Sequence, residues 1–331
     1  MLNQEGKATP SERVVLTGAS GILGFHLASQ LSDEARTAVL CLQRPSSQHR
    51  KLPAGVECHY VDFLARNALR EVIQRFRPRS IIHCAASGTQ FPKPNWFEMV
   101  RFNVDATLTL CESASLLEDC SFVYVSTGLA YRDQGRPLVE DDPLDTLHPY
   151  GASKAAADLL VRAAGAEFRV PLTVVRPFSF TGLADSGTRL FPALLRAAAE
   201  KRPFDMSPGD QVRDHSAVQD IARGVLAAAS LTRNHPQPLR VYNLGSGDTT
   251  SLKHLIQRLV SDLGLDLKLN FGARDYSPFE PHFMVADPAR ALADLGWRAQ
   301  TNLAYAVWQL AQEAFPSLKL RVPKEGFSHE R

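Results

Sequence analysis

The chain carries the stretch Val14-Val15-Leu16-Thr17-Gly18-Ala19-Ser20-Gly21-Ile22-Leu23-Gly24. Its three apolar residues predict a buried parallel strand, and Phe25-His26-Leu27-Ala28 directly after it predicts a helix. Glycine has no Cβ, so the backbone N–H groups of such a turn can approach a pyrophosphate at the positive end of the helix. The spacing GxxGxxG between a strand and a helix therefore predicts a dinucleotide-binding turn.

The composition excludes several classes of protein. The chain has 331 residues and a net charge of +2 without charged blocks, which argues against nucleic acid or a membrane surface as partner. It has no apolar stretch of membrane-spanning length, and its first residues lack the apolar core of a signal peptide. The cysteines have no metal-ligand spacing and predict core thiols in a reducing compartment, without a metal site: Cys41, Cys58, Cys84, Cys111 and Cys120. We therefore expect a cytoplasmic protein.

Strand and helix patterns alternate through the first half of the chain. Apolar strands are predicted at residues 39–42, 57–61, 80–84, 122–126 and 172–176, and helices at 67–76, 96–117 and 153–168. This rhythm is typical of a doubly wound parallel α/β sheet, in which ligands bind beyond the carboxyl ends of the strands. We expect a dinucleotide domain at residues 1–180, with 208–245 returning to it. A smaller, mixed α/β substrate domain is expected at residues 181–207 and 246–331.

A tyrosine and a lysine stand four residues apart in Tyr150-Gly151-Ala152-Ser153-Lys154, where a helix begins after the fifth strand. This spacing places both on one helical face, so the ammonium of Lys154 lies near the phenol of Tyr150. A nearby cation favours the phenolate and lowers the pKa of a tyrosine. Such a tyrosine can exchange a proton with a substrate oxygen during hydride transfer.

Taken in order, these motifs resemble the extended short-chain dehydrogenase/reductase family, which comprises NAD(P)-dependent sugar-nucleotide epimerases, dehydratases and ketoreductases. The resemblance runs from about Arg13 to Ala306 and implies a Rossmann-type fold. Further matches are Asp62, His83-Cys84-Ala85-Ala86, Asn103-Val104-Asp105-Ala106-Thr107, Val125-Ser126-Thr127-Gly128-Leu129-Ala130-Tyr131, Arg176-Pro177, Arg213-Asp214 and Asn243-Leu244-Gly245-Ser246-Gly247.

The resemblance implies roles for individual residues. The catalytic group is Thr127, Tyr150 and Lys154. The cofactor-binding residues are Gly18, Ser20, Gly21, Ile22, Leu23, Gly24, Arg44, Asp62, Phe63, Ala85, Ala86, Asn103, Tyr150, Lys154 and Pro177. The substrate-binding residues are the serine of Ser87-Gly88, Thr127, Ser179, Arg189, Arg213 and Arg274. We expect His83 to be structural, whereas His215, in place of the family's usual Phe, has no assigned role.

The end of the second predicted strand bears on the choice of cofactor. An acid there would bind the ribose 2′-hydroxyl of NAD, whereas the segment Leu42-Gln43-Arg44-Pro45-Ser46-Ser47 has no carboxylate. Arg44 with the two serines can form a phosphate cradle. The sequence therefore predicts NADP(H), with NAD(H) as the alternative.

The reaction is predicted from what the sequence lacks. The dehydratases of this family carry an acidic pair directly after the catalytic Thr, where this chain has Gly128 and Leu129. The stretch Arg176-Pro177-Phe178-Ser179-Phe180-Thr181-Gly182 resembles that of reductases acting on nucleotide-linked 4-keto-6-deoxyhexoses. We expect an NADPH-dependent ketoreductase of such a sugar. The alternatives are a sugar-nucleotide 4-epimerase with tightly bound NAD, a reductase of a non-sugar ketone, and a non-catalytic NADP-sensing protein.

The predicted helices 96–117 and 153–168 carry more small and apolar residues than one face against a sheet needs. In proteins that this chain resembles, two such helices from each subunit pair across a two-fold axis. We therefore expect a homodimer joined by a four-helix bundle.

Overall fold

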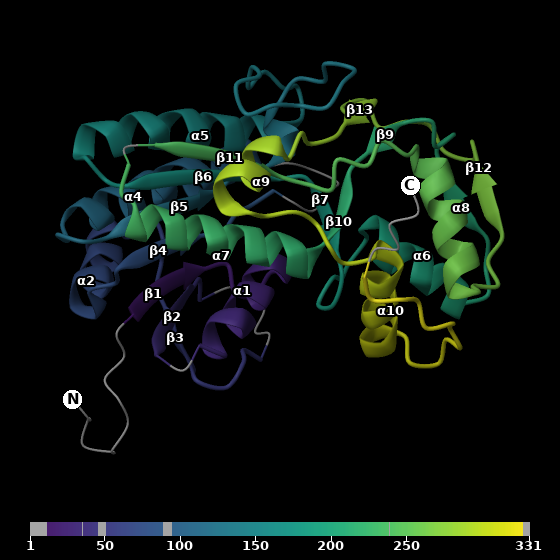
Figure 1. Ribbon diagram of the computed structural model, residues 1–331, viewed down its shortest axis with the longest axis horizontal. Helices are drawn as coiled ribbons and strands as arrows, with labels where there is room; N and C mark the ends of the chain where they lie inside the picture. Colours follow the sequence, from purple (N-terminus) through teal and green to yellow (C-terminus); the bar gives the residue numbers. More distant parts are fainter. Residues whose placement is uncertain (1–11, 35, 46–50, 89–94, 238, 327–331) are drawn as a thin grey trace.

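The structure is a computed structural model, and it describes residues 12–34, 36–45, 51–88, 95–237 and 239–326. Its centre is a seven-stranded parallel sheet in the order β11-β6-β5-β4-β1-β2-β3 (Figure 1). The strands are β1 (Glu12–Thr17), β2 (Thr37–Gln43), β3 (Val56–Tyr60), β4 (Ser80–His83), β5 (Ser121–Val125), β6 (Leu172–Pro177) and β11 (Arg240–Leu244). The predicted parallel α/β fold is confirmed.

Helices cover both faces of this sheet, which explains why its central strands are almost continuously apolar. On one face α1 (Ile22–Ser32) packs beside α7 (Val218–Asn234), with α9 (Ala289–Leu295) next to α7. On the other face α4 (Ala106–Ser115) lies between α2 (Arg66–Phe76) and α5 (Pro149–Phe168). Each face has its own buried apolar cluster, centred on Leu27 and Val225 in the first and on Leu110 and Val161 in the second.

The predicted helix 96–117 is three segments rather than one. α3 (Trp96–Val100) runs into a π-helical turn, η1 (Arg101–Asp105), which continues as α4. The extra residue of a π turn shifts the angular position of the preceding residues relative to the helix after it, and such turns are frequent at functional sites. Here the turn contains Asn103, which is fully buried.

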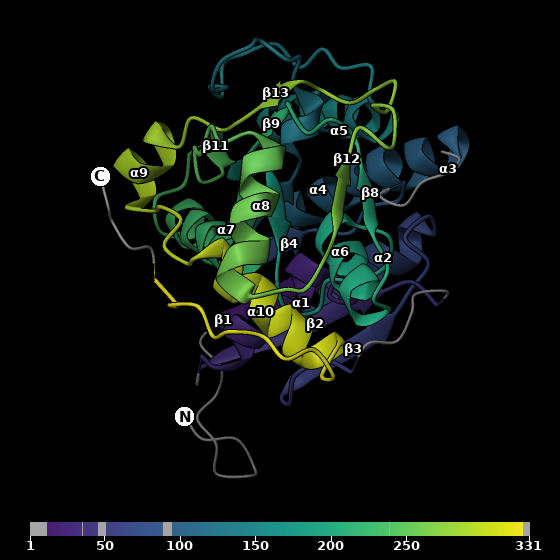
Figure 2. The ribbon, with the colours of Figure 1, turned by 90° about the vertical axis from the view of Figure 1, so that its right-hand side faces the viewer.

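The remaining elements form a smaller group beyond the carboxyl ends of the strands. α6 (Leu190–Ala199), α8 (Leu252–Leu263) and α10 (Leu303–Ala314) enclose a third apolar cluster (Figures 1 and 2). Three short parallel pairs accompany them: β7 (Ser179–Thr181) with β10 (His215–Ala217), β8 (Phe204–Met206) with β12 (Leu269–Phe271), and β9 (Val212–Arg213) with β13 (Phe283–Met284). Our residue boundaries for two domains remain a prediction.

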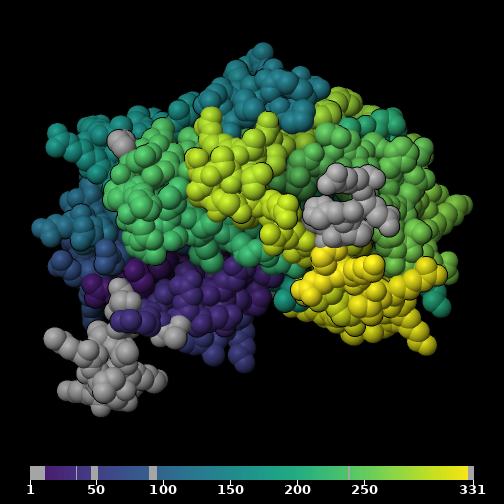
Figure 3. All heavy atoms as spheres, in the orientation of Figure 1, coloured from purple at the N-terminus to yellow at the C-terminus, as the bar shows by residue number. Residues whose placement is uncertain are grey.

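Two buried carboxylates hold late segments of the chain in place. Asp214 accepts hydrogen bonds from the backbone N–H groups of Ser246, Gly247 and Ala286. Asp220 on α7 accepts from the N–H groups of residues 300 and 301. Charge-assisted bonds of this kind are about twice as strong as neutral ones. Figure 3 shows the yellow C-terminal part of the chain packed against the rest of the molecule.

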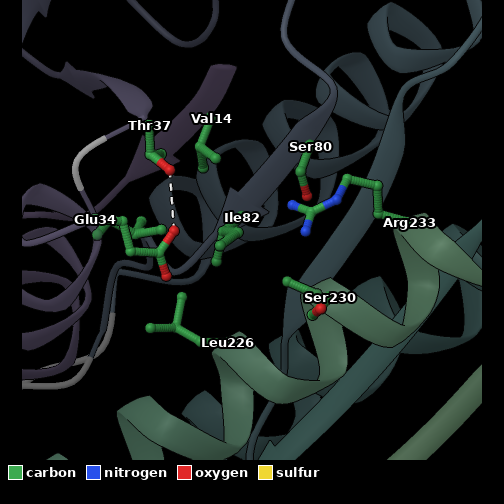
Figure 4. Close-up of a pocket in the computed structure, with 10 residues that line it drawn as sticks. Val14, Glu34, Thr37, Ser80, Ile82, Leu226, Ser230 and Arg233 are labelled. Carbon is green, nitrogen blue, oxygen red and sulfur yellow. Dashed lines mark hydrogen bonds between the residues drawn. The ribbon is translucent and has the colours of Figure 1, made fainter. Parts of the chain in front are cut away.

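A small cavity of about 80 Å³ lies on the α1/α7 face near the beginnings of β1, β2 and β4 (Figure 4). Thr37 donates a hydrogen bond to Glu34 there, and Arg233 approaches from α7. This cavity is at the opposite end of the strands from the glycine-rich turn. Across the described ranges, no helix is both long enough and apolar enough to span a membrane.

Candidate functional site

A cavity of about 790 Å³ opens at the carboxyl ends of the strands, between the sheet and the smaller group of elements. Its volume is in the usual range for small-molecule and cofactor sites. Most of the predicted cofactor and substrate residues line it: Gly18, Ser20, Gly21, Ile22, Leu23, Gly24, Arg44, Phe63, Ala85, Ala86, Ser87, Gly88, Thr127, Tyr150, Pro177, Ser179, Arg189 and Arg213. Asp62, Asn103, Lys154 and Arg274 are not among the lining residues.

The glycine-rich turn lies at one end of this cavity and fits a dinucleotide. Gly18 has φ +79°, and a Cβ on it would lie 2.7 Å from the backbone nitrogen of Ala85. A Cβ on Gly24 would collide with the carbonyl group of Gly18. α1 begins at Gly21 without a side-chain cap or an acidic residue in its first turn, so its first N–H groups are open to an anion.

Asn103 and Asp62 act on the backbone in this structure. The side chain of Asn103 accepts a hydrogen bond from Ser87 N (2.7 Å) and donates to Ser87 O (3.0 Å) and to Ser153 Oγ (2.9 Å). It therefore fixes the segment after β4 against α5. Asp62 is exposed and accepts from Leu64 N at 2.9 Å.

His83 belongs to a buried hydrogen-bonded chain beneath the cavity. Thr107 Oγ1 donates to Asn103 O (2.6 Å), so it accepts from Nε2 of His83 (2.9 Å). The other ring nitrogen then accepts from the hydroxyl of Thr17, which in turn receives the N–H of Ala85. Burial holds the pKa of His83 well below its usual range, with Lys154 adding to the effect. The neutral imidazole therefore links β4 to Thr17 of β1 and to Thr107 of α4. This is consistent with the structural role that we expect.

Thr127 and Tyr150 both line the cavity. Thr127 ends β5, and its Oγ1 accepts from Leu129 N at 3.2 Å. Tyr150 is in the first turn of α5, where the ring of His148 packs edge-on against it at 6.5 Å. Burial raises the pKa of Tyr150, and the positive charge of Arg189 opposes that rise. In the structure, the cation that favours the phenolate of Tyr150 is thus Arg189, whereas the sequence pointed to Lys154.

Lys154, four residues after Tyr150 on α5, is 1% exposed. Its Nζ is 4.1 Å from the centre of the Tyr124 ring. Burial lowers the pKa of Lys154 to about 7, although the thiol of Cys84 and the carboxylate of Asp158 both act to raise it. At neutral pH the amine is therefore close to half protonated.

We expect Lys154→Met to stabilise the cofactor-free protein by roughly 2 to 4 kcal/mol at pH 6. The unfolded chain keeps this amine protonated up to its ordinary pKa of 10.5, whereas the folded chain releases the proton near pH 7. The folded state is therefore penalised fully below pH 7, and the penalty fades as the pH approaches 10.5. Denaturant unfolding at pH 6 and pH 10 measures the difference.

The matched control is Lys253→Met. Lys253 is also placed over an aromatic ring, with its Nζ 5.4 Å from the centre of Phe271, but it is only half-buried. We expect a change below about 1 kcal/mol at either pH. Equal unfolding midpoints for wild type and Lys154→Met at pH 6 would contradict the buried-charge argument.

Two arginines from the smaller group of elements line the cavity, Arg189 at the start of α6 and Arg213 in β9. Arg189 pairs with Asp185 (3.1 Å) and donates to Phe180 O (2.6 Å). Arg213 pairs with Glu280 (3.1 Å), and its Nε is buried with no hydrogen-bond partner among the described residues. A buried orphan donor beside a cavity fits an anionic ligand. Arg274 is exposed, and its backbone N–H donates to Met206 O.

His215 packs edge-on against Phe191, with ring centres 5.2 Å apart. Burial and the charges of Arg213 and Arg189 lower its pKa to about 3. It is therefore a neutral aromatic group next to the arginine end of the cavity.

Sequence reasoning missed several residues that the fold brings to the cavity. Ser126 precedes Thr127, and its buried Oγ has no partner within the described residues. His148 caps α5 by accepting from Gly151 N at 3.3 Å, and it also lines the cavity. Both residues are close in sequence to Thr127 or Tyr150, and this closeness could have indicated that they belong to the site. Glu98 contacts two lining residues, Arg44 after β2 and Ser87 after β4. Its position in the sequence, far from both, gave no indication of these contacts.

Comparison with known proteins identifies a family. The model of the NAD dependent epimerase/dehydratase family matches residues 14–245. The UDP-glucose 4-epimerase of Dictyostelium discoideum is 26% identical over 321 residues, covering 88% of this chain and 92% of that protein. The UDP-glucose 4-epimerase of Azospirillum brasilense is 28% identical, covering 87% of each chain. The structure of MoeE5 in complex with UDP-glucose and NAD has a TM-score of 0.80 at 26% identity, covering 93% of this chain and 100% of that one.

The predicted NADPH-dependent 4-ketoreductase is wrong, because these relatives are named as 4-epimerases. Two structural reasons explain the error. Arg176, which opens the reductase-like stretch, is fully buried and bound to Asp158, so it reports on packing rather than on the reaction. The end of β2 lacks a carboxylate of its own, but that of Glu98 lies 3.5 Å from Arg44, so the local sequence did not describe the charges there.

Proposed function

Because this chain belongs to the NAD dependent epimerase/dehydratase family, we propose that it is a 4-epimerase of a UDP-linked hexose. One observation carries the proposal: a single cavity connects the open N-terminus of α1, the Thr127–Tyr150 pair and the two arginines at the far end. A dinucleotide fits the first part, a hexose the second and a nucleoside diphosphate the third. Two relatives support the proposal: one is named a UDP-glucose 4-epimerase, and the structure of the other holds UDP-glucose and NAD.

We propose NAD as the cofactor, held by the N–H groups of residues 22–24 and by the cavity walls at Phe63, Ala85 and Ala86. Pro177 lines the same cavity, and Asn103 holds the lining residue Ser87 through its backbone. When bound, NAD supplies reversible hydride acceptance at C4 of the sugar. NADP(H), expected from Arg44 with Ser46 and Ser47, is the alternative that the affinity measurements below separate; the two serines lie outside the described residues.

Tyr150 performs the proton transfer in this proposal. Although burial raises the pKa of Tyr150, its phenolate is the form that takes the proton of the C4 hydroxyl while the C4–H bond is broken, and it returns that proton when C4 is reduced from the other face. Thr127 Oγ1 holds the same sugar oxygen, and the positive charge of Arg189 favours the charged form of Tyr150, with Lys154 one helical turn further along α5. Proton and hydride are both returned, so the reaction has no net oxidation. The enclosed walls exclude water from the transient ketone.

The arginine end would hold the nucleotide part of the substrate. The orphan Nε of Arg213 is the donor best placed for a diphosphate, and Arg189 and Ser179 line the same cavity. The serine of Ser87-Gly88 lines the opposite side. Arg274 as a second phosphate ligand remains a prediction, and its exposed position would require the loop at 272–281 to bend inward.

The test is to incubate purified protein with UDP-glucose without added cofactor and to follow the C4 epimer, UDP-galactose, by proton NMR. We expect interconversion in both directions. UDP-glucuronate is the second substrate to examine. If neither UDP-sugar is converted with or without NAD, the proposed reaction is wrong. Conversion of ketones that lack a nucleotide would favour the non-sugar reductase instead.

We also propose a homodimer through the helices on the α2/α4/α5 face. Large apolar side chains are exposed along α3 and α5: Trp96, Phe97, Val100, Leu159 and Leu160. Contiguous exposed apolar residues mark an interaction surface. Light scattering at micromolar concentration is expected to give twice the chain mass of 36.4 kDa.

Leu159→Glu on α5 is expected to shift this mass to that of a monomer. Leu292→Glu on α9 is the control, because both leucines are 52% exposed on helices but Leu292 lies on the opposite face of the sheet. Monomeric wild type, or an unchanged dimer in Leu159→Glu, contradicts the proposed interface.

A further inference from the structure

The guanidinium of Arg44 stands at the end of β2 and lines the cavity. It lies over the ring of Phe102, 4.2 Å from the ring centre. Its Nη1 is 3.5 Å from Oε1 of Glu98. The contact with Phe102 therefore fixes the orientation of the guanidinium, and the contact with Glu98 offsets its positive charge.

Glu98 reaches Arg44 from a different part of the chain. It is the third residue of α3, and the same Oε1 accepts a hydrogen bond from Ser87 Oγ at 2.8 Å. Ser87 itself is held by Asn103 of the π-helical turn. Both partners of the carboxylate, Arg44 and Ser87, line the cavity.

A local role for Glu98 does not account for this geometry. Asn95 caps α3 by accepting from Glu98 N at 3.1 Å, and a glutamate at this helical position commonly bonds back to the capping residue. Here the carboxylate is instead committed to Ser87 and Arg44. Its contacts point toward the cofactor cavity rather than toward the helix end.

We propose that Glu98 makes the site select NAD over NADP, by supplying from α3 the negative charge that the end of β2 lacks. This inference rests on the proposed dinucleotide site. In Rossmann-type folds the end of the second strand meets the adenosine ribose, where an acid favours NAD and an arginine accommodates the 2′-phosphate of NADP. Glu98 neutralises that arginine and repels a phosphate placed beside it.

The size of the effect follows from the exposure of the pair. The side chains of Arg44 and Glu98 are 34% and 49% exposed, so their interaction with a phosphate is screened by water and salt. We therefore expect a discrimination of about tenfold, equivalent to about 1.4 kcal/mol. The same reasoning predicts that the preference for NAD decreases as the ionic strength rises.

The experiment measures dissociation constants of NADH and NADPH for nucleotide-free protein by fluorescence titration. We expect wild type to prefer NADH by at least tenfold. Glu98→Gln is expected to tighten NADPH about tenfold and to leave NADH within threefold. The double variant Arg44→Ala/Glu98→Gln is expected to lose this gain, because the freed arginine is what would bind the phosphate.

Glu112→Gln is the matched control. Glu112 also pairs with an arginine, Arg70 at 2.5 Å, and it lies on α4 of the same helical run but outside the cavity. The Glu112→Gln variant removes the same charge and is expected to leave the affinities for NADH and NADPH unchanged. Thermal unfolding of each variant confirms that it is folded.

Three results would overturn the assignment: equal affinities of wild type for both cofactors, an unchanged ratio in Glu98→Gln, or an equal change in Glu112→Gln. The epimerase proposal fails separately. If UDP-sugars are interconverted but Glu98→Gln leaves the ratio unchanged, only the role of Glu98 is wrong. If the ratio changes but no UDP-sugar is converted, only the proposed reaction is wrong.

Discussion

Tyr150→Phe is expected to lower the turnover of UDP-glucose by at least ~10²-fold, because it removes the only oxygen of this side chain that can carry a proton. The phenyl ring keeps the packing against His148, so substrate binding and stability are expected to change little. Epimerisation followed by NMR gives the turnover, and titration of UDP binding gives the affinity. A loss of turnover with intact binding is the signature of a proton-transfer role.

Tyr305→Phe is the control for this variant. Tyr305 stacks on Trp308 in α10, with ring centres 5.6 Å apart, and it does not line the cavity. Its hydroxyl is expected to be dispensable. A Tyr150→Phe protein that keeps more than a tenth of the wild-type turnover contradicts the assignment of Tyr150 as acid and base.

Asp158→Ala is expected to lower the free energy of unfolding by about 3–5 kcal/mol. Asp158 binds Arg176 through two hydrogen bonds of 2.9 and 3.0 Å, and both side chains are fully buried. Without the carboxylate, the guanidinium keeps only Tyr131 Oη (2.6 Å) and Glu140 O (2.9 Å), neither of which neutralises it. Chemical denaturation monitored by circular dichroism measures the loss.

The comparison variant is Asp145→Ala. Asp145 also pairs with an arginine, Arg132, but both side chains are more than half exposed. Exposed pairs contribute about 0–1 kcal/mol, so the midpoint is expected to shift little. Similar losses in the two variants would show that burial of the Asp158–Arg176 pair does not matter to stability.

The parts of the fold that depend on local pattern could be predicted from the sequence. Central parallel strands are buried on both faces, so residues 14–16 and 172–176 stand out as apolar runs. The ends of the helix at 252–263 are marked by local residues, because Ser251 caps it and Gly264 ends it in the left-handed conformation. The glycine-rich turn was recognisable because its spacing reflects close backbone contacts.

The parts that depend on contacts between distant segments could not be predicted. The π-helical turn at Arg101–Asp105 is only five residues long. Over so short a stretch the spacing of apolar residues does not distinguish a π turn from an α-helix. The partner of Arg44 comes from α3, 54 positions along the chain, and nothing in the local sequence of β2 indicates it. The expectation of NADP(H) rested on that strand end taken by itself, and the wrong reaction rested on short stretches at residues 128–129 and 176–182 taken without their surroundings.

The π-helical turn has a consequence for how this chain tolerates changes in length. A helix turns by about 100° per residue. Deleting one residue between 101 and 105 would let the turn close into α-helix with the upstream residues at nearly their present angle, whereas closing the turn with all its residues kept would rotate everything upstream by about that angle relative to α4. Glu98 would then swing away from Arg44 with its own sequence and that of Arg44 intact. The phase of one helix, set by a single surplus residue, thus becomes a determinant of cofactor choice that no comparison of side chains at the site would reveal.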